Sequence, residues 1–220
     1  MFQNSYKGKV VLVTGHTGFK GSWLVTWLLK LGAKVIGVSK DIPTNPSMFE
    51  SLDIEKKIFH NFIDIRDLEK LKGIISKYNP DFIFHLAAQA IVSKSYLNPV
   101  ETVSSNVIGT MNILEALRFY KKKCITIIIT SDKCYDNIEQ SEGYKETDAI
   151  GGKDVYSGSK GAAELIIKSS SKSSKYSGNI DNIPIEIQYI RSKPCYMVAK
   201  SEEGLDRAHK KALDRLIHRG

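Results

Sequence analysis

The sequence predicts an α/β protein with a Rossmann-like, doubly wound parallel sheet flanked by helices. Three features predict it: a glycine-rich turn between a strand and a helix near the N-terminus, continuous apolar strands, and helices of ten or more residues between strands. Apolar strands suit a parallel sheet covered on both faces, and the strand–helix alternation implies right-handed crossovers. With 220 residues, 42% of them hydrophobic, the chain is long enough to bury a core of its own.

The expected strands are short and rich in β-branched residues, and helical stretches separate them. We expect strands at residues 10–14, 35–39, 59–63, 82–86, 125–130 and 183–190. We expect helices at residues 22–31, 67–78, 100–120 and 157–168. The Ser/Lys-rich stretch 168–175 has no apolar face and is expected to be an exposed loop or a frayed helix end.

The first strand leads into three glycines, Gly15, Gly18 and Gly21, and a helix follows at once. Gly15 can take a tight turn, Gly18 lets the backbone approach a pyrophosphate, and Gly21 lets the helix pack closely on the strand. The first-turn amides and the helix dipole then face the diphosphate. The alternative is a strand–turn–helix with incidental glycines. The cofactor-binding residues expected in this turn are Gly15, Thr17, Gly18, Phe19 and Gly21.

Other candidate residues follow the later strands, at the edge where such sheets bind ligands. Asp41, 20 positions after Gly21, could bind the ribose hydroxyls and favour NAD over NADP. Lys40 beside it weakens that inference, and an ordinary loop aspartate is the alternative. Asp64 could hold the adenine amino group, with Ile65 packed on the ring. Small side chains after the fourth strand would let its backbone approach the cofactor, in the segment Leu86, Ala87, Ala88 and Gln89.

The chemistry is assigned to Tyr156 and Lys160, which are four positions apart on an expected helix and therefore share a face. An ammonium close to a phenol favours the phenolate, which would lower the tyrosine pKa from about 10 toward the range of a general base. Ser131, at the end of the fifth strand, could hold a substrate hydroxyl and complete a Ser/Tyr/Lys set. Asp132 and Lys133 add two titratable groups at the same strand tip.

Composition argues against several classes of protein. No apolar run reaches the roughly 18 to 20 residues that a membrane span needs, and the polar N-terminus does not resemble a signal peptide. Three cysteines without metal-ligand spacing indicate reduced thiols in a cytoplasmic protein. The net charge is +8, but the lysines are scattered, which favours a nucleotide ligand over a nucleic acid.

The remaining histidines and tryptophans have simpler interpretations. His16 and His85 are expected to form local hydrogen bonds rather than to bind a metal, because no third ligand is apparent. Trp23 and Trp27, four residues apart on the first helix, are expected to pack against other parts of the protein.

With these motifs the chain resembles the extended short-chain dehydrogenase/reductase family, and within it the branch that dehydrates CDP-glucose at C4 and C6. The segments that carry the resemblance are 14–21, 85–90, 98–102, 106–110, 130–135 and 156–161. The triplet Ser131-Asp132-Lys133 is the discriminating part. Related nucleotide-sugar dehydratases typically have Thr-Asp-Glu there, and epimerases lack the acid/base pair.

The resemblance implies an NAD-dependent dehydratase of nucleotide-sugar biosynthesis, with lipopolysaccharide O-antigen as its setting. Tyr156 would take the proton of the C4 hydroxyl, while Lys160 holds the nicotinamide ribose. Lys133 would remove the C5 proton if its amine is neutral, which burial beside a bound cation would favour. Asp132 would protonate the departing C6 hydroxyl, and the hydride taken from C4 would return to C6. The family also implies a homodimer through a helix bundle, formed by the helix at 100–120 and the one that bears Tyr156, and no membrane or nucleic-acid partner.

Beyond residue 168 the resemblance fades. We expect an NAD-binding domain at 1–191 and a divergent tail at 192–220, with a short helix and with the substrate domain largely missing. Such a chain is expected to bind NAD weakly and to show little or no dehydratase activity. The alternatives are a non-catalytic NAD-binding protein and a nucleotide-sugar epimerase.

Overall fold

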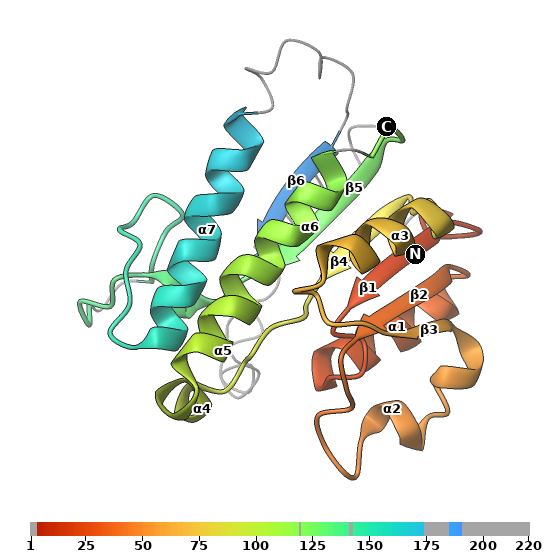
Figure 1. The fold of residues 1–220 in the computed structure, drawn as a ribbon, viewed down its shortest axis with the longest axis horizontal. Coiled ribbons are helices and arrows are strands. Elements are labelled where there is room, and N and C mark those ends of the chain that lie inside the picture. Colours follow the sequence, from red (N-terminus) through yellow and green to blue (C-terminus); the bar gives the residue numbers. More distant parts are fainter. Residues whose placement is uncertain (1–3, 119, 141–142, 174–184, 191–220) are drawn as a thin grey trace.

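A computed structural model describes residues 4–118, 120–140, 143–173 and 185–190. The expected doubly wound architecture is confirmed: six parallel strands form one sheet in the order β3-β2-β1-β4-β5-β6 (Figure 1). Strand order reverses between β1 and β4, the place where such sheets open a crevice for ligands. The strands are β1 (Val10–Thr14), β2 (Lys34–Ser39), β3 (Phe59–Phe62), β4 (Phe82–His85), β5 (Cys124–Ile129) and β6 (Ile185–Ile190).

Helices connect the strands and cover both faces of the sheet. They are α1 (Phe19–Lys30), α2 (Met48–Ser51), α3 (Leu68–Tyr78), α4 (Val92–Leu97), α5 (Pro99–Val103), α6 (Gly109–Arg118) and α7 (Val155–Ser173). The helix expected at 100–120 is α5 and α6 joined by a π-helical turn, Ser104–Ile108. Such a wide turn often occurs at a functional site.

The two faces of the sheet have separate apolar cores. On one face, α3 and α6 pack on β1, β2 and β4 through side chains that include Leu12, Leu71, Ile83 and Ile113. On the other face, α1 packs through Val25 and Leu28. In Figure 1, α3, α6 and α7 lie in front of the sheet and α1 lies behind it. Burial on both faces explains why the strands are apolar throughout.

One expectation about the helices was wrong. Trp23 and Trp27 do not pack in the core, because their side chains are 57% and 45% exposed. They lie two residues from the buried Val25, about 200° around the helix axis. The stretch 168–175 begins as a helix end, one of the two expected alternatives, since α7 continues to Ser173. Between Gly161 and Gly178 the sequence contains no glycine or proline.

The expected tail at 192–220, with its short helix, lies outside the described residues, as does Cys195. Cys124 and Cys134 are free and buried. Among the described helices, none combines the length and the hydropathy of a membrane span.

We predict that Ile83→Ala destabilises the protein, because Ile83 is fully buried in β4 between the neighbouring strands and α3. A cavity at such a site costs about 2–5 kcal/mol of unfolding free energy, which urea denaturation measures. Ile138→Ala is the matched control, because Ile138 is 69% exposed and its truncation is expected to change stability by less than about 0.5 kcal/mol. Equal losses in the two variants would contradict the assignment of Ile83 to the core.

Candidate functional site

A cavity of about 910 Å³ opens at the carboxyl ends of the strands. Its walls come from the segments that follow β1 to β5 and from α7, so it lies where the strand order reverses. Most of the site residues expected from the sequence line it: Gly15, Thr17, Gly18, Phe19, Gly21, Asp41, Asp64, Ile65, Leu86, Ala87, Ala88, Gln89, Ser131, Tyr156 and Lys160. Asp132 and Lys133 are not among its lining residues.

The glycine turn is shaped by close backbone contacts. Gly15 has a φ of +73°, and a Cβ there would lie 2.7 Å from the Ala87 nitrogen. A Cβ on Gly21 would lie 2.7 Å from His16 Cα and closer still to the Gly15 carbonyl oxygen. Gly18 is different, since its nearest neighbour would be 3.4 Å away and its φ of −73° suits any residue. Gly15 and Gly21 therefore serve the fold, whereas the space beside Gly18 is open.

Helix α1 points its N-terminus at the cavity. Gly18 is its N-cap and provides no side-chain hydrogen bond, and no acidic residue lies in the first turn. The amides of this turn and the positive end of the dipole are therefore available to an anion.

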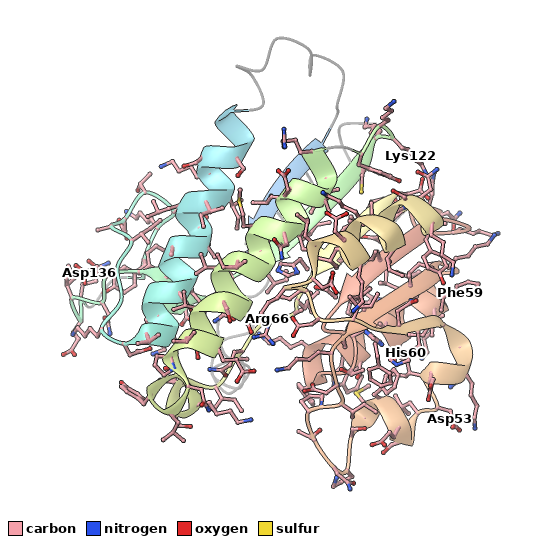
Figure 2. The ribbon with its side chains drawn as sticks, in the orientation of Figure 1. Asp53, Phe59, His60, Arg66, Lys122 and Asp136 are labelled. Carbon is pink, nitrogen blue, oxygen red and sulfur yellow. The ribbon has the colours of Figure 1, made fainter. Side chains whose placement is uncertain are left out.

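His16 anchors the same turn to the sheet. Its fully buried ring lies on Gly37 of β2, where a Cβ would be 2.5 Å from His16 Cδ2. Its Nδ1 is 2.9 Å from Ser39 Oγ, and its Nε2 is 2.7 Å from His60 Nδ1. Burial lowers the pKa of His16 to about 4, so the ring is neutral near pH 7. Figure 2 shows His60 at the β2–β3 side of the sheet.

His85 supports the turn from β4. Its Nδ1 is 2.7 Å from Thr14 Oγ1, and its Nε2 is 3.3 Å from Thr110 Oγ1. The Ala87 amide also donates to Thr14 Oγ1. These contacts confirm the local hydrogen bonding expected for His16 and His85. Within the described ranges, no group of three or more His, Cys, Asp or Glu side chains could hold a metal ion.

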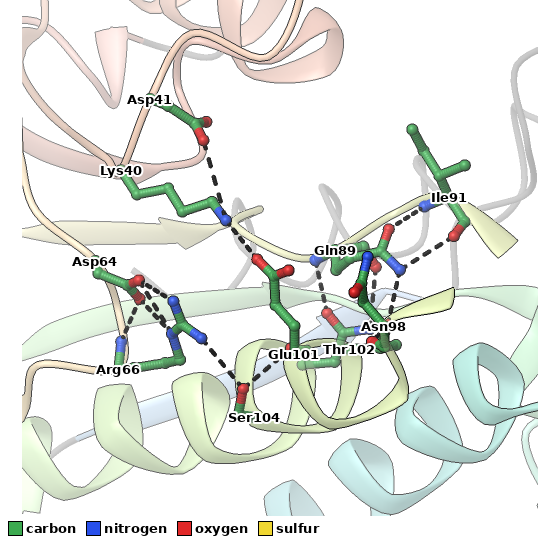
Figure 3. A network of polar contacts seen from close by, with 11 residues as sticks. Lys40, Asp41, Asp64, Arg66, Gln89, Ile91, Asn98, Glu101, Thr102 and Ser104 are labelled. Carbon is green, nitrogen blue, oxygen red and sulfur yellow. Dashed lines mark hydrogen bonds and ion pairs between the residues drawn. The ribbon is translucent and has the colours of Figure 1, made fainter. Parts of the chain in front are cut away.

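The carboxylates after β2 and β3 are already engaged with basic side chains (Figure 3). Asp41 Oδ2 is 4.0 Å from Lys40 Nζ, and Thr17 Oγ1 donates to the Asp41 carbonyl at 2.7 Å. Asp64 accepts hydrogen bonds from the Arg66 guanidinium, the shortest 2.5 Å, and these hold the pKa of Asp64 below its usual value. Ile65 borders the cavity, but its side chain reaches toward Gly109 in α6. An adenine group would therefore meet an Asp64 that is paired with arginine.

Tyr156, Lys160 and Ser131 lie together at the inner end of the cavity. All three are buried, with 8%, 7% and 6% of their surface exposed. Ser131 follows β5 and forms a hydrogen bond with the Tyr156 side chain. The i, i+4 spacing on α7 places Lys160 on the same helix face as Tyr156. The three groups that the sequence assigned to one site therefore line one cavity.

Buried polar residues hold α7 in position. Asn106 in the π-helical turn donates to Ser159 Oγ at 2.9 Å and also to the Gln89 carbonyl. The Gln89 amide donates back to Asn106 Oδ1 at 2.8 Å. The sequence analysis did not assign Asn106 or Ser159 to the site. Their function depends on contacts between distant segments, which local spacing does not reveal.

Burial controls the pKa values of the two central groups. It lowers the pKa of Lys160 from its ordinary 10.5 to about 8, and the neighbouring charge of Lys20 adds to this. It raises the pKa of Tyr156, against the hydrogen bond with Ser131. The expected lowering of the tyrosine pKa was therefore wrong for this state of the protein. The cost of burying a phenolate is the largest effect, and the Asp132 carboxylate adds to it.

Asp132 and Lys133 begin a 3₁₀ turn, Asp132–Cys134, directly after Ser131. Ser131 Oγ donates to Asp132 Oδ1 at 3.1 Å and accepts from the Lys133 amide. The Lys133 side chain is exposed, so the burial that was expected to favour its neutral form is not found. The structure places both residues beside the cavity but not in its wall.

The comparisons with known proteins agree on one family. A family model described as GDP-mannose 4,6 dehydratase matches residues 12–183. CDP-glucose 4,6-dehydratase of Salmonella typhimurium is 49% identical over 164 residues, which is 74% of this chain and 46% of that protein. CDP-paratose 2-epimerase of Salmonella typhi is 36% identical over 141 residues, covering 63% of this chain and 41% of that protein. The chain thus spans about half the length of these relatives.

A solved structure with the same fold is UDP-glucose 4-epimerase of Thermus thermophilus in complex with NAD. Its TM-score is 0.68 at 27% identity, over 83% of this chain and 54% of that one. These matches confirm the resemblance to extended short-chain dehydrogenases/reductases.

We predict that alanine destabilises the protein at one glycine of the turn and not at another. Gly21→Ala is expected to lower the melting temperature by several degrees or to prevent folding, because the new Cβ overlaps the Gly15 carbonyl and His16 Cα. Gly18→Ala is the matched control and is expected to melt within about two degrees of the wild type, since its Cβ has room. Differential scanning calorimetry measures both. A Gly21→Ala variant as stable as Gly18→Ala would contradict the close packing.

We also predict that Lys160 lowers stability at neutral pH. Its pKa in the folded protein, about 8, lies below the ordinary value of 10.5, so the unfolded chain binds the proton more tightly. The free energy of unfolding of the wild type should therefore rise between about pH 8 and pH 10.5, by up to about 3 kcal/mol. Lys160→Met should lack this rise and be more stable at pH 7.

Urea denaturation at several pH values measures the difference in unfolding free energy between the wild type and Lys160→Met. The contributions of the other titrating groups cancel in this difference. Lys121→Met, a change at an exposed lysine, serves as the control and should follow the wild type. A difference between wild type and Lys160→Met that does not depend on pH would show that Lys160 titrates normally.

Proposed function

The chain belongs to the GDP-mannose 4,6 dehydratase family of extended short-chain dehydrogenases/reductases, and from this membership we propose that it binds NAD and dehydrates a nucleotide-sugar. The observation that carries the proposal is the convergence of Ser131, Tyr156 and Lys160 in the cavity that the glycine turn opens. A cavity built only to bind a nucleotide would not need a phenol, a hydroxyl and a buried amine together at its inner end.

The cavity fits a dinucleotide at both ends. A pyrophosphate would lie against Gly18 and the first-turn amides of α1, since an added Cβ on Gly18 would meet nothing closer than 3.4 Å. Asp41 follows β2, the position from which a carboxylate binds the adenosine ribose. At the other end, Lys160 would hold the nicotinamide ribose. NAD supplies hydride acceptance and return to this site when it is bound.

Tyr156 would accept the proton of the C4 hydroxyl. Its phenolic oxygen lies beside Ser131, whose hydroxyl would turn from Asp132 Oδ1 to donate to the phenolate, while its oxygen accepts a hydrogen bond from the sugar hydroxyl. With a pKa of about 8, Lys160 is largely charged at neutral pH, and its ammonium would favour the phenolate.

Loss of water from C5 and C6 is assigned to the residues after Ser131. Asp132 would donate a proton to the leaving C6 hydroxyl, and Lys133 would accept the C5 proton. Support comes from their position, since both lie in the turn that Ser131 begins. Because Lys133 is exposed, it would approach the sugar from outside the cavity wall.

CDP-glucose is the proposed substrate, supported by the 49% identity to a CDP-glucose 4,6-dehydratase. A nucleotide-sugar epimerase is the second candidate, because an epimerase is 36% identical and the NAD-bound epimerase has the same fold. An NAD-binding protein without catalysis is the third. The cytoplasmic setting and the O-antigen pathway expected from the sequence belong to this proposal as well.

A homodimer is also part of the proposal. Apolar side chains on α5, α6, α7 and the turn between α5 and α6 are exposed: Val100, Val103, Ile108, Met111 and Leu165. Helix faces of this kind are those from which the family's expected four-helix interface would be built.

We predict that Tyr156→Phe reduces turnover by about 10²–10⁴-fold, because it removes the group that takes the C4 proton. The assay incubates the purified chain with NAD and CDP-glucose, at protein concentrations near that of the substrate, and follows the 4-keto-6-deoxy product by mass spectrometry. NAD affinity, measured by calorimetric titration, should change by less than about threefold. Tyr96→Phe is the matched control, because Tyr96 is exposed and outside the cavity lining.

The outcomes separate the three candidates. Product in the wild type and not in Tyr156→Phe supports the dehydratase. Conversion to a stereoisomer of the same mass supports the epimerase. A wild type that binds NAD and converts no nucleotide-sugar supports the non-catalytic protein, and a wild type that does not bind NAD rejects all three.

A further inference from the structure

An ion pair crosses the rim of the cavity between two segments that are far apart in the sequence. Lys40 Nζ, in the segment after β2, is 2.8 Å from Glu101 Oε1 in α5 (Figure 3). Both residues line the cavity, and their side chains are 46% and 41% exposed. The pairing raises the pKa of Lys40, so the lysine carries a full charge near neutral pH.

Glu101 is held by a well-anchored helix. On the next residue, Thr102 Oγ1 accepts a hydrogen bond from Gln89 Nε2 at 2.9 Å and donates to the Asn98 carbonyl. Gln89 is itself fixed to Asn106 through its backbone. The Glu101 carboxylate therefore faces Lys40 from a helix whose place is set by other contacts.

Lys40 lies where the adenosine ribose of a dinucleotide would be bound. It precedes Asp41, and the Asp41 carbonyl is tied to Thr17 of the glycine turn at 2.7 Å. The end of the second strand is the place where an acidic residue selects a free 2′-hydroxyl and where a basic residue accommodates a 2′-phosphate. This chain has both kinds of residue there, so Asp41 alone does not decide the preference.

The charged groups around Lys40 come from three segments. Asp41 belongs to its own loop, Glu101 to α5, and Asp64 with Arg66 to the segment after β3. Arg66 is engaged by Asp64 and also reaches Ser104 Oγ at 3.3 Å. Among the groups that interact around Lys40, three carboxylates face two cations, Lys40 included, and this local excess of negative charge opposes a phosphate dianion.

We propose that Glu101 determines the preference for NAD over NADP by keeping Lys40 from a 2′-phosphate. The inference rests on the proposed function, since it concerns the same cofactor site. Without Glu101, the Lys40 ammonium keeps only its 4.0 Å contact with Asp41 and can form a charge-assisted hydrogen bond with the phosphate, and the charges around it lose one carboxylate. Exposed ion pairs contribute little to stability, so removal of Glu101 should leave the fold intact.

Calorimetric titration of NAD and NADP into wild type and Glu101→Gln tests the proposal. We expect the ratio of the NADP to the NAD dissociation constant to fall about tenfold in Glu101→Gln, and the change to shrink at high salt. The double variant Lys40→Met/Glu101→Gln should lose the gain. Glu115→Gln is the matched control, because it removes the carboxylate of another ion pair, with Arg118 on α6, away from the cavity lining.

A ratio within twofold of wild type in Glu101→Gln would overturn the proposal. So would a gain that persists in the Lys40→Met background, or an equal gain in Glu115→Gln. In each of these cases wild-type binding of NAD leaves the proposed function standing. If the wild type binds neither dinucleotide, both the proposed function and this inference fail.

Discussion

The close approach of backbone segments at the end of β1 is the constraint on which the site depends. Helix α1 can begin directly after the turn only because Gly15 and Gly21 leave no side chain between the turn, the helix and the segment after β4. This packing fixes the direction of α1, and the direction of α1 aims its uncapped N-terminus at the cavity. The remaining walls are added by the ends of β2 to β5, which the parallel sheet brings to one edge.

The sequence predicted the parts of the protein that local pattern determines. Apolar runs located the strands to within one or two residues, and the turn at Gly15 and the pair Tyr156 and Lys160 were assigned correctly to one edge. Long-range contacts were not predictable in this way. Lys40 and Glu101 are 61 residues apart, and the exposure of Lys133 depends on how the turn after Ser131 bends. The orientation of Trp23 was misjudged because two hydrophobic residues on a helix need not share its buried face.

Several polar groups are buried beside the cavity. Lys160 and Glu164 are both nearly inaccessible, and Glu164 accepts a hydrogen bond from Thr130 at the end of β5. Asn106 and His85 fill neighbouring positions with satisfied hydrogen bonds. An apolar layer would stabilise the fold more simply, because each polar group must recover the hydration that it loses. Their presence in this layer fits a protein that gives up stability to keep reactive groups in fixed positions.

The contact between His16 and Gly37 links two positions that are otherwise unrelated in sequence. The His16 imidazole fills the space that a methyl group on residue 37 would need. A residue with a side chain can therefore replace Gly37 only if a smaller residue has first replaced His16. Replacing His16 first causes no such clash, because a smaller residue at position 16 leaves Gly37 sterically unaffected. Evolutionary change at the two sites is therefore directional, and substitutions there should be strongly non-additive. A protein that retains His16 must therefore also retain Gly37.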